Sequence, residues 1–193
     1  MEVECYVMRN STVFVAVLIW AVLVVVAVHF LDFPGSVPNF HQVSGGGTLL
    51  DAVPAFTADG IYQRLDAYGD EGRKNYSFRN MTVDILLPLS VLPFLFLLML
   101  RTVTAVPVGR LVRATLLSVP LVYVIFDLLE NSMVLVLLSS YPERLDTLAM
   151  NLPYATIIKR SASLLAIGVP LMVLGFGSLR RLQKPKIHHT GAD

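Results

Sequence analysis

Residues 114–138 read ATLLSVPLVYVIFDLLENSMVLVLL, an apolar run with three strongly polar side chains in its second half. About 20 mostly apolar residues are enough for a helix to cross a bilayer. The polar residues are Asp127, Glu130 and Asn131. Helical positions three and four apart share one face, so these side chains lie together. Because an acid at the bilayer centre costs ~2.5–3.5 kcal/mol, we expect this face to point into the bundle, a cavity or a partner.

Three further segments are predicted to cross the membrane, at about residues 12–31, 83–100 and 161–179. Each is almost wholly apolar, and lipid cannot satisfy backbone hydrogen bonds, so each must be helical. The apolar run at 12–31 exceeds the ~7–15 residues of a signal-peptide core, which favours a span. The predicted fold class is therefore all-α integral membrane, with four transmembrane helices in a single domain over residues 1–193 and a helical outer cap between helices 1 and 2.

Composition supports a membrane protein and excludes several other classes. The chain has 193 residues, of which 55% are hydrophobic and 15% charged, whereas soluble domains are ~25% charged. Fifteen basic residues balance fourteen acidic ones, so no overall field would attract nucleic acid. The single cysteine excludes an intrachain disulfide. No sequence motif indicates a cofactor or metal, although His188 and His189 adjoin in the polar tail, residues 180–193.

The distribution of Lys and Arg predicts the orientation. One side would hold the N-terminus, the 101–113 connection and the tail, with eight basic residues: Arg9, Arg101, Arg110, Arg113, Arg180, Arg181, Lys184 and Lys186. The other side would hold the 32–82 loop and a 139–160 loop, with seven: Arg64, Arg73, Lys74, Arg79, Arg144, Lys159 and Arg160. The eight lie in much shorter segments. Both termini are therefore predicted on the cytoplasmic-equivalent side.

The loop at 32–82 changes character along its length. Residues 32–54 contain three prolines and three consecutive glycines, which favours irregular structure. Thr57 is a candidate N-cap for a short helix that Gly69 would end, before a second helix runs into the second span. This cap has two interpretations: a surface helix that seals the bundle, or a lid over a ligand cavity. In the second, Tyr62, Tyr76 and Arg73 would supply polar tips on apolar bodies.

A polar network is predicted to extend from the outer face to the middle of the third span. Its candidate members are Asp127, Glu130, Asn131, Asp84, Lys159, Arg73 and Tyr76. Four uses stay open: structural pairing with neighbouring helices or a buried cation, binding of a ligand or lipid head group, a proton or cation relay, and catalysis by paired carboxylates.

Several stretches resemble a pattern found in uncharacterised four-span membrane proteins, mainly bacterial. The pattern is G-x-x-G-R-x-x-Y, D-x-x-x-P, F-D-x-x-E-N and T-x-x-K, matched here at residues 69–76, 84–88, 126–131 and 156–159. The resemblance covers about residues 57–180. It implies that these residues form one site, and no activity comes with it.

Two functions follow as expectations. The first is a non-enzymatic membrane protein, either a subunit of a membrane complex or a binder of lipid or a lipophilic small molecule through the polar midplane site. The second is an integral-membrane enzyme or transporter for a lipophilic substrate that uses Asp127 and Glu130. A cavity lined by both acids would favour the second function. Acids fully satisfied by Lys159, Arg73 or neighbouring helices would favour the first.

Overall fold

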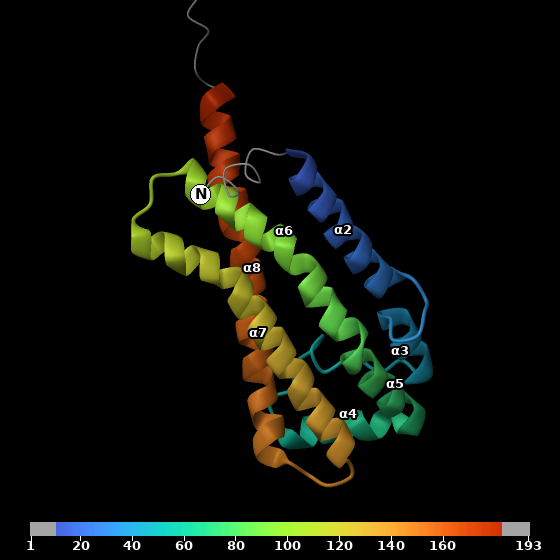
Figure 1. Ribbon diagram of the computed structural model, residues 1–193. Coiled ribbons are helices and arrows are strands. Elements are labelled where there is room, and N and C mark those ends of the chain that lie inside the picture. The colour runs from blue at the N-terminus through green and yellow to red at the C-terminus, as the bar shows by residue number, and fades with distance from the viewer. Residues whose placement is uncertain (1–10, 183–193) are drawn as a thin grey trace, which may run out of the picture.

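The computed structural model describes residues 11–182, with side chains through residue 175, and this part of the chain is helical. Four stretches are long and apolar enough to cross a membrane, as a multi-pass membrane protein requires (Figure 1). They are α2 (Ser11–Phe30), α5 and α6 (Gly69–Met81 and Val83–Ala105), α7 (Arg110–Ser140) and α8 (Asp146–Leu182). Arg9, both tail histidines, Lys184 and Lys186 lie outside the described residues.

The fourth helix begins much earlier than the sequence analysis predicted. α8 starts at Asp146 rather than near residue 161, so the expected 139–160 loop is wrong. Only a short connection around Pro142 joins α7 to α8. Residues 146–160 are helical because small and apolar side chains recur on one face: Ala149, Leu152 and Ala155 are all buried. A search for continuous apolar runs misses this periodicity, because charged residues interrupt the segment 146–160.

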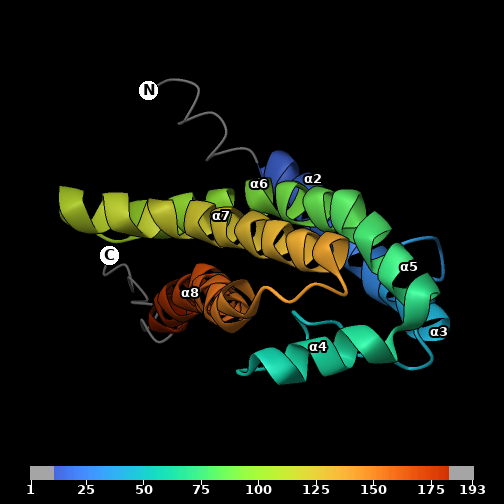
Figure 2. The ribbon, with the colours of Figure 1, turned by 90° about the horizontal axis from the view of Figure 1, so that it is seen from below.

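Three of the long helices form the body of the bundle. α7 packs along α8 and α6, and α6 also packs on α8. α2 lies along the outer side of α6, away from α8 (Figure 2). Its only buried residues are Ala21 and Val28, and the rest of its surface is apolar and largely exposed. This exposure fits a helix that faces lipid over most of its circumference.

The connecting segment, residues 31–82, packs against one end of the bundle. It contains α3 (Val37–Val43), α4 (Ala58–Ala67) and α5. A single apolar cluster joins these elements to α7 and α8, with Phe40, Leu65, Tyr76 and Leu137 almost fully buried in it. The packing of the segment is therefore continuous with the core of the bundle.

The predicted start of α4 is confirmed and part of the predicted irregular segment is not. Thr57 caps α4 by accepting a hydrogen bond from the Gly60 amide at 3.1 Å. Gly69 has a φ of 64°, which suits the turn between α4 and α5. Residues 37–43, expected to be irregular, form α3, because Ser36 caps it and a proline occupies its first turn.

α7 and α8 are longer than a bilayer requires. They contain 31 and 37 residues, or about 46 and 55 Å at the rise of an α-helix, against about 30 Å of hydrocarbon. Both extend beyond the end of α2 to reach the connecting segment (Figure 1). A residue in the middle of α7 or α8 therefore need not lie level with the middle of α2 or α6.

Candidate functional site

Lys159 of α8 lies at the centre of a group of buried carboxylates. Its ammonium nitrogen is 3.2 Å from Asp127 Oδ1 and 3.8 Å from Asp51 Oδ2, and it also pairs with Glu130. The Lys159 side chain is 11% exposed and that of Glu130 is fully buried. One ammonium group thus compensates three acids that come from α7 and the connecting segment. A buried group of charges like this one is stable only where further hydrogen bonds satisfy the remaining polar atoms of the side chains.

Glu130 is held in place by α8. The Thr156 hydroxyl donates to Glu130 Oε1, and the Leu152 carbonyl oxygen, 3.2 Å away, is an alternative acceptor for the same hydrogen. Thr156 and Lys159 are three positions apart on one face of α8, and both contact Glu130. The sequence pattern that pairs these two residues therefore corresponds to a two-point attachment of α8 to α7.

A second ion pair lies at the start of α6. Arg79 Nη2 is 2.7 Å from Asp84 Oδ1, and Arg79 Nη1 donates to the Gly35 carbonyl oxygen at 2.8 Å. Asn131 links this pair to the first group, because its amide nitrogen donates to the Asp84 carbonyl oxygen at 2.8 Å and to Asp127 Oδ2 at 3.4 Å. The polar residues of α6, α7 and α8 therefore form one continuous network.

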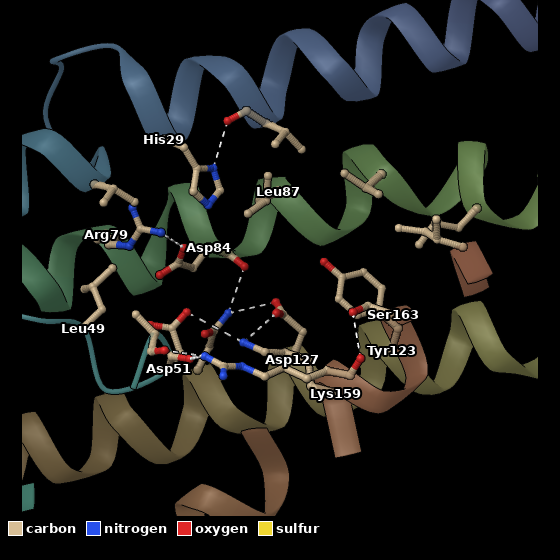
Figure 3. Close-up of a pocket in the computed structure, with 18 residues that line it drawn as sticks. His29, Leu49, Asp51, Arg79, Asp84, Leu87, Tyr123, Asp127, Lys159 and Ser163 are labelled. Carbon is tan, nitrogen blue, oxygen red and sulfur yellow. Dashed lines mark hydrogen bonds and ion pairs between the residues drawn. The ribbon is translucent and has the colours of Figure 1, made fainter. Parts of the chain in front are cut away.

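A cavity of about 410 Å³ adjoins this network. Its polar wall is formed by Asp51, Arg79, Asp84, Tyr123, Asp127, Asn131, Lys159 and Arg160. Its apolar wall includes Val25, Leu49, Leu87, Val91, Leu95 and Ile167. Figure 3 shows His29 pointing inward from α2, with Asp127, Lys159 and Asp51 together on the opposite side of the site. The cavity is thus amphipathic, because both charged and aliphatic side chains line it.

The structure separates the two acids that the sequence placed together. Asp127 lines the cavity, whereas Glu130 is fully buried behind it and bound to Lys159 and Thr156. A group that touches a ligand must face the space in which the ligand lies. Asp127 meets that condition, and Glu130 acts on the site through Lys159.

Arg73 and Tyr76, two of the predicted site residues, lie elsewhere. Arg73 donates to the Leu65 carbonyl oxygen at 2.8 Å, pairs with Asp70 and stacks 4.1 Å above the centre of the Tyr141 ring. The Tyr76 hydroxyl is buried in the connecting segment, where it accepts from the Leu50 amide at 3.1 Å. Both residues stabilise the packing of the connecting segment, and neither lines the cavity.

Asp51, Arg79 and Tyr123 line the cavity but are missing from the predicted site. Arg160, which borders the predicted fourth span beside Lys159, lines it as well. Asp51 lies in a loop whose sequence gives no sign of its fold. Arg79 precedes Asp84 by five positions, and only the break between α5 and α6 at Thr82 brings the two side chains together. The Arg160 guanidinium donates to the Ala52 carbonyl oxygen at 2.6 Å. The charge of Arg79, next to a predicted span, was the one signal available.

The network lies level with the ends of two helices rather than with their middles. Asp84 is the second residue of α6, and the α2 residues that line the cavity, Val25 and His29, are in its last turns. Asn131 contacts Asp84 directly. Asp127 is central in its own apolar run only because α7 continues well past this level. The sequence predicted a network that extends from the outer face to the middle of the third span. The structure aligns the whole network with the helix ends nearest the connecting segment.

The arrangement offers charge, hydrogen bonds and an apolar surface. Within residues 11–175, no three His, Cys, Asp or Glu side chains are grouped so that they could hold a metal ion. Carboxylates paired with a lysine can orient a polar ligand or carry a proton. Comparison of the chain with models of protein families, with curated proteins and with solved structures gave no match.

Proposed function

We propose that this protein is a non-enzymatic membrane protein that binds an amphiphile, a lipid or a lipophilic small molecule, in the cavity between α2 and α8. The amphipathic lining of the cavity carries the proposal. A volume of about 410 Å³ falls within the range of about 300–1,000 Å³ typical of ligand pockets. The charged groups of the lining suit a head group, and its aliphatic side chains suit a chain.

We infer that the cavity opens sideways, between α2 and α8. α2 packs along α6 and shares no extensive contact with α8. Val25 of α2 is 38% exposed and Ile167 of α8 is 43% exposed, yet both line the cavity. They form an apolar rim on opposite helices. An alkyl chain can extend between them into the hydrocarbon region while its head group remains in the cavity.

Filling the cavity is expected to abolish ligand binding. Leu87 lines it, whereas its neighbour Leu86 is 62% exposed and points away. Leu87→Trp adds bulk inside the cavity. We expect wild type to co-purify with an amphiphile and to be labelled by a photoactivatable alkyl probe, and we expect the variant to lose both. Native mass spectrometry and probe incorporation measure the two effects.

Leu86→Trp is the matched control, with the same change one position away on the lipid-facing surface. It should retain both the bound amphiphile and the labelling. Equal labelling of the two variants would contradict binding in this cavity.

We further propose that the connecting segment is an outer cap and that both termini face the cytoplasmic side, as the Lys and Arg distribution favours. Gln63 is exposed on α4, and Leu111, 80% exposed, lies at the opposite end of the bundle. In a chain with Cys5→Ser, Gln63→Cys should react with an impermeant maleimide on intact cells. Leu111→Cys should react only after permeabilisation. The reverse labelling pattern would show that the protein has the opposite orientation in the membrane.

The alternative is a transporter or enzyme that acts on a lipophilic substrate. It draws support from the Asp127–Lys159 ion pair, which faces the cavity and could exchange a proton with a bound molecule. Glu130 lies outside the cavity and would not take part directly. A role as a subunit of a membrane complex remains compatible with the exposed apolar surface of α2. If the resemblance to uncharacterised four-span proteins reflects a common fold, those proteins would have the same site.

A further inference from the structure

The cavity is lined by carboxylates whose oxygens are incompletely satisfied by the described residues. Asp51 Oδ1 is buried and accepts no hydrogen bond from the described residues. Asp127 Oδ2 receives one long contact, 3.4 Å from the Asn131 amide nitrogen. Ionised carboxylates only accept hydrogen bonds, and each can accept several. A ligand that meets this wall therefore needs donors.

The cations around the cavity are already engaged. Lys159 faces three carboxylates. Arg79 is bound to Asp84 and the Gly35 carbonyl oxygen, and this fixed guanidinium leaves one buried nitrogen, Nε, unpaired. Arg160 is turned to the carbonyl oxygens of Asp51 and Ala52. None of the three is free to move toward an anionic head group without breaking these contacts.

The formal charge of the site is negative. Four carboxylates belong to it: Asp51, Asp84, Asp127 and Glu130. Three cations oppose them: Arg79, Lys159 and Arg160. The remaining ionisable groups that face the cavity, His29 and Tyr123, carry no negative charge in their ordinary forms at neutral pH. In a site of low dielectric, one unbalanced negative charge favours a cation or a proton.

We propose that the head group bound here is a protonated primary amine. Its N–H groups donate to Asp51 and Asp127, and its charge balances the excess carboxylate. Its alkyl chain passes Leu87 and leaves between Val25 and Ile167. The inference deepens the proposed function, on which it rests, by naming the chemical class of the amphiphile: a long-chain amine.

Four probes with the same twelve-carbon chain test the head group directly: dodecylamine, dodecyltrimethylammonium, dodecanol and dodecyl sulfate. The full chain in nanodiscs is equilibrated with each probe, and retention is compared with empty nanodiscs of the same lipid. Dodecylamine is expected to bind at least about tenfold more tightly than dodecyltrimethylammonium, which is cationic but has no N–H donor, since a single charge-assisted hydrogen bond is worth about that factor. Dodecyl sulfate should bind weakest.

Two variants locate the effect. Asp51→Asn removes a charge from the cavity, so dodecylamine should bind about tenfold more weakly while dodecanol is unaffected. Glu71→Gln is the matched control, because Glu71 forms only an exposed pair with Lys74, and it should bind as wild type. If Asp51→Asn does not fold, Asp127→Asn replaces it, and the four-probe comparison on wild type needs no variant.

The outcomes separate this inference from the proposed function. Equal or tighter binding of dodecyl sulfate or dodecanol, abolished by Leu87→Trp, would overturn the amine and leave the amphiphile site standing. If dodecyltrimethylammonium bound as tightly as dodecylamine, N–H donation to the carboxylates would be excluded as the basis of recognition. Absence of Leu87-dependent binding for all four probes would overturn both proposals.

Discussion

Replacing Lys159 with alanine is expected to lower the free energy of unfolding by about 3–5 kcal/mol, the usual cost of removing one partner from a buried ion pair. Lys159 compensates Asp51, Asp127 and Glu130, and the Glu130 side chain is completely buried. Without the ammonium group, these acids must either remain charged and unpaired or take up protons. Thermal or denaturant unfolding of the purified protein in detergent measures the loss.

Lys74→Ala provides the comparison for the loss of a lysine as such. Lys74 pairs with Glu71 on the surface, with both side chains more than 70% exposed, and exposed pairs contribute only about 0–1 kcal/mol. Adding Glu130→Gln to Lys159→Ala should recover part of the stability, because it removes the most deeply buried of the three charges. If Lys159→Ala unfolded like Lys74→Ala, the ion-pair network would not stabilise the fold.

Replacing Asp127 with leucine is expected to cost about 1–3 kcal/mol, whereas asparagine should be tolerated. Leucine leaves the Asn131 amide and Lys159 without one acceptor, and unsatisfied buried groups cost about this much. Asparagine keeps the shape and one oxygen acceptor while removing the charge. Thermal stability of the two variants, measured beside wild type, tests the difference.

The same pair of variants separates binding from transport or catalysis. If Asp127 only holds Lys159 and contacts a head group, Asp127→Asn should fold normally and still bind an uncharged amphiphile. If Asp127 carries protons, Asp127→Asn should bind but lose all proton-coupled movement of substrate in sealed vesicles. Wild-type stability and binding in a double variant, Asp127→Leu with Glu130→Leu, would exclude any role for the polar site.

Some features of the site were accessible from the sequence because they depend on helix periodicity alone. Asp127, Glu130 and Asn131 share a face of α7 at spacings of three and four, and the structure buries all three. Lys159 was accessible for a different reason, since a cation that flanks a predicted span needs either the interface or a buried acid. The cap at Thr57 is equally local, because the hydroxyl and the amide it binds are three residues apart.

Other features depend on contacts between segments far apart in the chain. Asp51 reaches Lys159 only because the loop after α3 packs against α8, and no local pattern encodes that contact. Arg73 matched a sequence pattern shared with Lys159, yet it points to Tyr141 because α5 turns that face toward the end of α7. Residues that belong to one sequence pattern can therefore lie in two separate parts of the fold.

Four apolar helices long enough to cross a membrane, and a polar face on the third, follow from the sequence alone, because apolar length and 3.6-residue periodicity are properties of single helices. Tertiary structure alone decided the level of the site, the separation of Asp127 from Glu130 and the recruitment of Asp51 and Arg79. These depend on how far α7 and α8 extend past α2 and α6, and on how the connecting segment packs on them. Such offsets follow from side-chain packing between helices, which no single segment specifies.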